Sequence, residues 1–209
     1  MRKSLRRRSS SPRRFALSTE TPEAALPELA EEPRVDLTHL EAYAIDDEGN
    51  QDPDDAVSLE PGRLWVHVAD VAALVTPNGP ADLEARGRGA NLYLPEGTVP
   101  MLPPAATAAL GLGLAEVSPA LSFGLDNDPD GRITSVEIAP SWVRAQRLTY
   151  EQAQERLDTE PFSGLYHLAQ LNLERRIGNG AVSIEWPEVK IRVEDGRVSV
   201  RPLPPSPSR

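Results

Sequence analysis

The sequence contains no cysteine among its 209 residues, which excludes disulfide bonds, zinc–thiolate sites and a cysteine nucleophile. It has three histidines, and no two of them have the spacing of metal-ligating pairs, so a histidine metal site is not predicted. No segment approaches the roughly 18 consecutive apolar residues that cross a bilayer. No long apolar segment follows the basic start, as it would in a secretory signal. We therefore predict a cytoplasmic protein that does not contact the membrane.

Charge is distributed unevenly along the chain. Seven of the 22 Lys and Arg residues lie in residues 1–14, which leaves 15 basic residues against 32 acidic ones in the rest. A tail of arginine and serine could bind nucleic acid electrostatically. The alternatives are a disordered terminus without a partner, a misplaced start codon or translation in a wrong frame. Residues 1–35 show no sustained hydrophobic period, so we predict a disordered, basic and Pro/Glu-rich tail there.

Residues 36–203 show the hydrophobic patterns of regular secondary structure, and residues 204–209 are predicted to be a disordered C-terminus. The prolines of residues 91–104 predict an ordered loop. The pattern predicts an α+β fold, a mixed or antiparallel sheet flanked by helices. Strands are predicted at 42–45, 56–60, 63–70, 119–125, 132–145, 181–186, 189–194 and 197–202, and helices at 82–89, 149–157 and 163–177.

Four aspartates lie within ten residues: Asp46, Asp52, Asp54 and Asp55. Carboxylates this close repel one another unless cations or solvent separate them, so the cluster is a candidate site for hard divalent metals. Apolar segments on both sides predict a loop between two strands. In an extended chain Asp55 would point away from Asp52 and Asp54, so convergence requires a bend or a loop shaped by Pro53. The alternative is a solvated acidic loop.

The spacing I-D-x5-D-x-D-D-A, from Ile45 to Ala56, resembles the signature of the ribonuclease II (RNB-domain) exoribonucleases. LWVHVADVAALV (64–75) and DLEARGRGANLYLPEGTVPMLPP (82–104) resemble the segments that follow in that family. VRAQRLTYEQAQ (143–154) and RRIGNGAVSIEWPEVKI (175–191) come in the same order. Nothing matches the second half of the RNB domain, with its arginine-rich segment, or the OB-fold that usually follows. The chain therefore resembles the N-terminal half of an RNB domain, from a truncated, frameshifted or split gene.

The resemblance implies a hydrolytic 3′-5′ exoribonuclease that acts on single-stranded RNA with Mg²⁺, or Mn²⁺ in its place, and releases nucleoside 5′-monophosphates. It implies that Asp46, Asp52 and Asp55 are metal ligands and that Asp54 is the catalytic carboxylate. It also implies that Tyr93 packs against the terminal base; the alternative is that Tyr93 is an ordinary packing residue.

Two other functions compete with this one. The chain could be a catalytically incomplete fragment: an RNA-binding remnant, or a split-gene product that requires the missing C-terminal half in trans. Residues 126–137 also fit the EF-hand calcium pattern, with oxygen ligands at Asp126, Asp128, Asp130 and Glu137. The segments on either side alternate as strands do, whereas an EF-hand requires helices there, so an Asp-Gly hairpin turn is favoured.

Overall fold

The structure is a computed structural model that describes residues 20, 22–94, 97–182, 189–194 and 197–202. Within these residues, seven strands form one mixed sheet in the order β1-β8-β7-β4-β3-β2-β9. The predicted fold class is thereby confirmed. The strands of this sheet are β1 (Val35–Asp36), β2 (Ala42–Asp46), β3 (Asp55–Glu60), β4 (Arg63–Ala69), β7 (Ser118–Asn127), β8 (Ile133–Val143) and β9 (Ala145–Thr149).

The centre of the sheet is an antiparallel series, β8-β7-β4-β3-β2, and its two edge strands pair in parallel. The turn between β3 and β4 is Pro61-Gly62, and Gly62 has a φ of +81°. A left-handed backbone of this kind favours glycine, which has no Cβ to clash with the chain. The alternation of apolar residues that predicted β3 and β4 also fixes their register, because a slip by one residue would turn every side chain to the other face. In this register Val57 lies opposite Val66.

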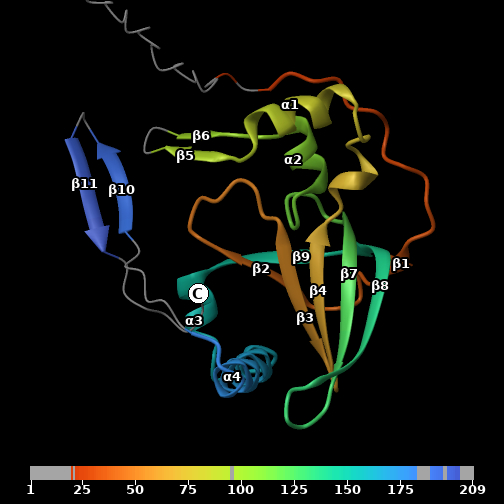
Figure 1. The fold of residues 1–209 in the computed structure, drawn as a ribbon, viewed down its shortest axis with the longest axis vertical. Helices are drawn as coiled ribbons and strands as arrows, with labels where there is room; N and C mark the ends of the chain where they lie inside the picture. The colour runs from red at the N-terminus through yellow and green to blue at the C-terminus, as the bar shows by residue number, and fades with distance from the viewer. Residues whose placement is uncertain (1–19, 21, 95–96, 183–188, 195–196, 203–209) are drawn as a thin grey trace, which may run out of the picture.

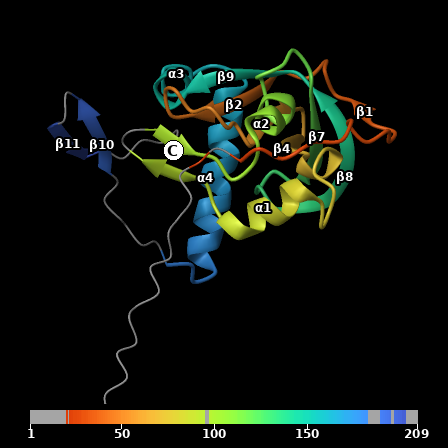
Figure 2. The ribbon, with the colours of Figure 1, turned by 90° about the horizontal axis from the view of Figure 1, so that it is seen from above.

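Helices lie at both ends of the sheet (Figure 1). The 3-10 turn η1 (Val71–Ala73) and helices α1 (Pro80–Arg88) and α2 (Pro104–Leu110) occupy one end. Helices α3 (Tyr150–Gln154) and α4 (Phe162–Gly178) lie towards the other, and Figure 2 shows α4 well apart from β1, the edge strand that pairs with β8. Among the described residues, no helix combines the length and the apolar character that a membrane crossing requires.

Segments 91–104 and 132–145 differ from the prediction. The predicted loop 91–104 contains a short hairpin, β5 (Leu92–Leu94) and β6 (Gly97–Val99), and ends where α2 begins at Pro104, because proline suits the first turn of a helix. The predicted strand 132–145 is two strands, β8 and β9, interrupted at Arg144. Most of the predicted strand 181–186 lies outside the described residues. The hairpin of β10 (Val189–Glu194) and β11 (Arg197–Pro202) agrees with its predicted bounds.

The second half of the predicted tail makes contacts that its composition did not indicate. Leu26 and Leu29 pack against the buried cluster of Leu74, Ala106 and Leu110. The N–H of Ala30 donates to the carbonyl of Ala73 at 2.8 Å. Residues 22–34 have no regular secondary structure, so no helical or strand periodicity in the sequence could have indicated that they pack on the domain. Residues 1–19 and 21 lie outside the described residues, and their disorder stays a prediction.

The two faces of the sheet differ in how completely they are covered. The closed face carries buried apolar side chains of five strands: Ala44, Ala56, Trp65, Ala120 and Val143. The open face carries six apolar side chains of β3, β4, β7 and β8, and none of the six is buried: Val57, Leu64, Val66, Leu125, Val136 and Ile138. Near β2, Tyr43 on the open side packs on Phe162 of α4, with ring centroids 4.7 Å apart. The core therefore lies mainly on the closed face.

Candidate active site

The four predicted aspartates lie at one end of the sheet. Asp46 is the last residue of β2 and Asp55 is the first residue of β3, while Asp52 and Asp54 lie in the loop between them. Because β2 and β3 are antiparallel neighbours, the end of one strand lies beside the start of the next. The fold thus gathers all four carboxylates in one loop and its two strand ends.

Pro53 anchors this loop to the protein core. Its side chain is buried, and its carbonyl accepts a hydrogen bond from the N–H of Leu112 at 3.0 Å. The carbonyl of Asp54 accepts one from the N–H of Ala69 at 2.8 Å. These bonds fix the backbone on both sides of the Pro53-Asp54 bond, while the side chains of Asp54 and Asp55 remain exposed. The sequence indicated a loop shaped by Pro53 as one way to bring the carboxylates together. The structure contains this loop, and backbone hydrogen bonds hold it in place.

Asp52 is held by two side chains from the segment after α1. The Tyr93 hydroxyl donates to Asp52 Oδ2 at 2.8 Å, and Asn91 Nδ2 donates to the same oxygen. Asn91 is itself oriented by the N–H of Met101, which donates to its Oδ1 at 2.6 Å. Asn91 was not predicted as a site residue. Its position two residues before Tyr93, in a segment that carries the family resemblance, was the available signal.

Asp46 is held from within the loop. Asn50 Nδ2 donates to Asp46 Oδ2, and the N–H of Asp47 donates to Asp46 Oδ1 at 3.1 Å. Arg147 on β9 donates to the carbonyl of Asn50. This arginine therefore supports the loop through its backbone and forms no recorded bond with a carboxylate of the cluster. Asn50 and Arg147 were not predicted, because neither the loop conformation nor the β2–β9 pairing can be read from local sequence.

The electrostatics at Asp54 and Asp55 oppose negative charge on these two carboxyls. Reduced hydration is the main cause that raises the pKa of Asp54, followed by the negative charges of Asp52, Asp55 and Asp46. The pKa of Asp55 is raised by reduced hydration and then by Asp46. Both side chains reach solvent, which limits the desolvation, but the like charges around them act in the same direction. A cation near Asp54 would relieve this repulsion.

The donor set fits a hard cation in its chemistry, since all four groups offer carboxylate oxygens. Its geometry is not preformed: among the residues that the structure describes, no group of three acidic or histidine side chains is placed to hold a metal ion. Asp46 and Asp52 are engaged by the amides of Asn50 and Asn91. Each amide donates to one oxygen of its carboxylate, and a carboxylate has about four acceptor sites, so both side chains can keep the amide donor and still offer oxygen to an ion.

Behind the site, a chain of polar groups crosses the closed face. His67 is fully buried on β4; its Nε2 lies 2.9 Å from Ser58 Oγ and its Nδ1 lies 2.7 Å from Ser122 Oγ. Ser122 Oγ lies 2.5 Å from Ser141 Oγ, which extends the chain to β8. Burial lowers the pKa of His67 to about 4, so the imidazole is neutral at pH 7. These four buried groups tie neighbouring strands together and are remote from solvent.

Asp70, which follows β4, has a partner of its own. Arg34 donates to Asp70 Oδ2 at 2.7 Å, and its guanidinium lies 5.4 Å from the centre of the Trp142 ring. The Arg34 side chain is almost completely buried, with 1% of its surface exposed. A buried charge of this kind is stable only when it is paired. Asp70 therefore helps to hold the N-terminal segment on the sheet beside the loop of the candidate site.

The loop with the EF-hand pattern is a hairpin turn between β7 and β8, as the alternation around it favoured. Arg63 forms ion pairs with Asp126 and Glu137, each at 2.7 Å, and the bond from Arg63 lowers the pKa of Asp126. Asp128 Oδ1 accepts hydrogen bonds from the N–H groups of Asp130, at 3.0 Å, and Arg132, at 2.8 Å. Strands lie on both sides of this turn, and the side chains of Asp126, Asp128 and Glu137 already have partners within the protein.

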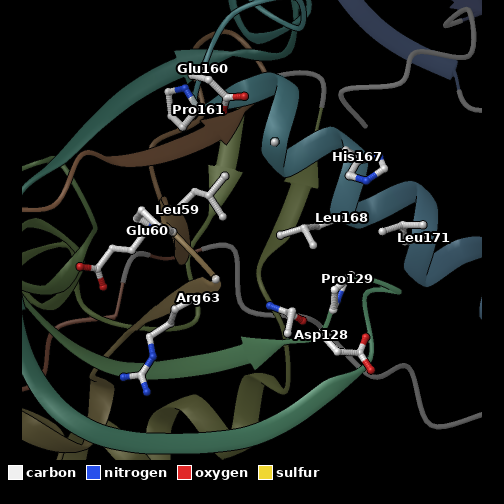
Figure 3. Close-up of a pocket in the computed structure, with 14 residues that line it drawn as sticks. Leu59, Glu60, Arg63, Asp128, Pro129, Glu160, Pro161, His167, Leu168 and Leu171 are labelled. Carbon is white, nitrogen blue, oxygen red and sulfur yellow. The ribbon is translucent and has the colours of Figure 1, made fainter.

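Two cavities of different size flank β3. A cavity of about 140 Å³ adjoins the candidate site and is lined by Asp52, Asp54, Asn91 and residues of α2. A larger one, of about 700 Å³, lies by the Pro61-Gly62 turn, at the opposite end of β3 from Asp55. The larger cavity, shown in Figure 3, lies away from the four aspartates, so the candidate active site is identified by its carboxylates and not by the size of a cavity.

The RNB domain family model matches residues 34–206. The chain belongs to the RNB domain family. An uncharacterized ribonuclease of Synechocystis is 42% identical over 172 residues, covering 77% of this chain and 26% of the relative. Ribonuclease II of Arabidopsis chloroplasts and mitochondria is 38% identical over 186 residues, covering 83% of this chain and 22% of the relative.

Among solved structures, Mycoplasma genitalium RNase R in complex with ribose-methylated single-stranded RNA superimposes with a TM-score of 0.75 and 25% identity. The match covers 84% of this chain and 30% of that one. This RNB-domain chain thus spans about a quarter of the length of the two curated relatives. The family predicted from the aspartate spacing and the segments after it is confirmed.

Proposed function

We propose that this RNB-domain chain is a 3′-5′ exoribonuclease that hydrolyses single-stranded RNA and releases nucleoside 5′-monophosphates. The observation that carries the proposal is the gathering of Asp46, Asp52, Asp54 and Asp55 at one end of the sheet, in a chain of this family. The similarity to an RNase R solved with single-stranded RNA supports this substrate.

We further propose Mg²⁺ as the cofactor, with Mn²⁺ as an alternative. Asp46, Asp52 and Asp55 would hold it, since its preferred ligands are oxygens. When bound, a pair of such ions lowers the pKa of a water molecule and offsets the negative charge that develops on the phosphate. Within the protein, Asn50 and Asn91 orient two of these carboxylates before any ion arrives.

Asp54 is the carboxylate proposed to act in the chemical step. It lies between the proposed metal ligands Asp52 and Asp55, and as a carboxylate it can accept a proton from the attacking water. The water oxygen forms a bond to phosphorus while the bond from phosphorus to the 3′-oxygen of the shortened RNA breaks. That 3′-oxygen takes up a proton from solvent, and Asp54 returns to solvent the proton that it accepted. The terminal residue leaves as a nucleoside 5′-monophosphate.

Tyr93 is proposed to support the terminal base. Its side chain is 66% exposed, and its hydroxyl is fixed on Asp52, so one edge of the ring is anchored while its surface remains accessible. Stacking on an aromatic ring contributes roughly 1–3 kcal/mol per base and tolerates any base. Such a contact suits an enzyme that removes nucleotides without regard to sequence.

The test follows the decay of a 5′-labelled single-stranded RNA with purified protein and Mg²⁺. We expect stepwise shortening, and a loss of about 1000-fold in rate in Asp54→Asn, because the neutral amide cannot accept the proton. Glu48→Gln is the matched control: it removes an exposed negative charge from the same loop and should leave the rate nearly unchanged. Equal losses in both variants would show that only the net charge of the loop matters.

A second candidate is a catalytically incomplete RNB fragment that binds RNA without cleaving it. Two observations favour this candidate. The described residues contain no preformed group of three metal ligands, and the chain spans about a quarter of the length of its two curated relatives. In this case a folded sample would retain labelled RNA in a binding assay and leave its length unchanged in Mg²⁺ or Mn²⁺. That result would exclude hydrolysis by this chain alone.

A further inference from the structure

The hairpin of β10 and β11 has two faces of opposite character. In an antiparallel pair, residues directly opposite each other lie on the same face. The register places six apolar residues on one face: Val189, Ile191, Val193, Val198, Val200 and Pro202. The other face combines four basic residues with one acidic residue and one serine: Lys190, Arg192, Arg197, Arg201, Glu194 and Ser199. One face of the hairpin is therefore apolar, and the other, the basic face, is positively charged.

The basic face contrasts with the acidic sequence before it. Residues 36–188 contain nine basic residues against 25 acidic ones, a net charge of −16, whereas the basic face has a net charge of +3. Four of the nine arginines in residues 36–188 form ion pairs with carboxylates: Arg63, Arg86, Arg88 and Arg144. Solubility does not require the basic face, because a large net charge already keeps a protein soluble. The concentration of positive charge on this hairpin therefore indicates an anionic partner.

Two basic residues stand directly opposite each other on this face. Lys190 of β10 and Arg201 of β11 are partners in the register. Arg201 is exposed and forms no ion pair with the side chains that the structure describes. Like charges in directly opposite positions destabilise a pair of strands, and a two-stranded hairpin is at best marginally stable in water. Stability alone would therefore not favour this pair, whereas an anion bound beside both residues would offset their repulsion.

We propose that the basic face of β10 and β11 binds the phosphate backbone of single-stranded RNA. Alternate residues of a strand are ~7 Å apart, so neighbouring basic residues can contact successive phosphates of an extended RNA strand. The face contains no aromatic residue on which a base could stack, so the contact is independent of the base sequence. The inference rests on RNA as the substrate proposed above, and it adds a binding surface outside the aspartate cluster.

The test measures the affinity of the purified full chain for a fluorescently labelled single-stranded RNA at several salt concentrations. EDTA is present, so metal-dependent hydrolysis does not interfere. In Lys190→Gln/Arg201→Gln we expect Kd to rise about tenfold at moderate salt, and the slope of log Kd against log salt to fall by about 1.4, because two phosphate contacts are lost. Thermal unfolding should show no loss of stability, since the substitutions remove a pair of like charges.

The binding test is separate from the activity test. A chain that binds RNA through the basic face but does not shorten it would contradict the proposed function and support this inference. An active chain whose affinity for RNA is the same in Lys190→Gln/Arg201→Gln would do the reverse. In that case the RNA contact would lie elsewhere, for instance on the basic residues 1–14. A loss of binding to vesicles of anionic phospholipid in the same variant would then identify a membrane surface as the partner.

Arg132→Gln/Arg176→Gln is the matched control. Both arginines are exposed, lie outside the hairpin and form no ion pair with the described side chains, so the control removes the same charge from another part of the protein. Salt screens exposed charges over about 10 Å, so the control should change Kd by less than about twofold. Equal losses of affinity in the two variants would overturn the proposal, because only the net charge of the protein would then matter.

Discussion

The two faces of the central sheet have similar apolar content but different roles. The closed face buries Trp65 and Val143 and carries a chain of buried polar groups through His67 in which each side chain has a hydrogen-bond partner. The open face exposes Val136 and Ile138 and leaves cavities beneath α4. Hydrophobicity alone therefore does not determine which face of a sheet is buried. The distinction depends on which segments the chain itself supplies to cover each face.

The largest expected effect of a single substitution on stability is on the closed face. Trp65→Ala removes a side chain that is 5% exposed, together with the hydrogen bond from its Nε1 to Glu60 Oε2 at 2.6 Å. We expect it to lower the free energy of unfolding by about 3–5 kcal/mol. Phe123→Ala on the half-covered open face is the comparison and should cost clearly less. Urea denaturation of both variants measures the difference, and equal losses would contradict a division into closed and open faces.

The second expected effect is an acid sensitivity of the closed face. His67 has a pKa of about 4 in the folded protein against 6.5 when unperturbed, so the unfolded chain takes up the proton first as the pH falls. The stability that the neutral His67 contributes is complete above about pH 6.5. Between about pH 6.5 and pH 4 the free energy of unfolding should fall by an amount on the order of 3 kcal/mol for this reason. Denaturation measured across this range should show the loss.

The variant His67→Gln has no titratable group at this position, so its stability should depend less on pH between 6.5 and 4. His39→Gln is the control, because His39 is exposed and lies outside the buried chain of polar groups. The control should retain the acid loss of the native protein. If the native protein and His67→Gln lost stability in parallel as the pH fell, the buried histidine would not be the source of the acid loss.

The third and smallest effect compares one residue type on one strand. Val143 and Val136 both lie on β8, but Val143 is 0% exposed on the closed face and Val136 is 54% exposed on the open face. Val143→Ala should cost about 2 kcal/mol in the free energy of unfolding, because buried methyl groups are lost and a cavity remains. Val136→Ala should change it by less than about 0.5 kcal/mol. A large loss in Val136→Ala would indicate that the chain already buries its open face, for instance by self-association.

Much of the fold could be predicted because its signals are local. Alternating apolar residues gave β3 and β4, and the Pro61-Gly62 turn gave the hairpin between them. The break between β8 and β9 at Arg144 was missed, because the apolar pattern continues through it while the partner strand changes from β7 to β2. The contacts of Leu26 and Leu29 were missed for a related reason, since a segment without secondary structure has no period to detect.

The candidate site was likewise predicted where its signals are local and missed where they depend on long-range contacts. The spacing from Asp46 to Asp55 indicated the carboxylates, and the adjacent motifs indicated the family. Asn91 and Arg147 could not be assigned to the site, because they lie 39 and 97 residues away from their partners Asp52 and Asn50. Contacts over such separations depend on how the strands and helices pack. The roles proposed for Asp54 and Tyr93 remain predictions that the RNA decay assay tests.

The sequence by itself determined the family, the composition of the acidic cluster and the strands that present it, because residue spacing and apolar alternation are properties of neighbouring residues. The tertiary structure decided which carboxylates are held by amides, which histidine is buried and neutral, and which face of the sheet stays open. These depend on long-range packing, since burial and hydrogen-bond partners arise only when distant segments meet. Val143 and Val136, the same residue on the same strand, differ for that reason alone.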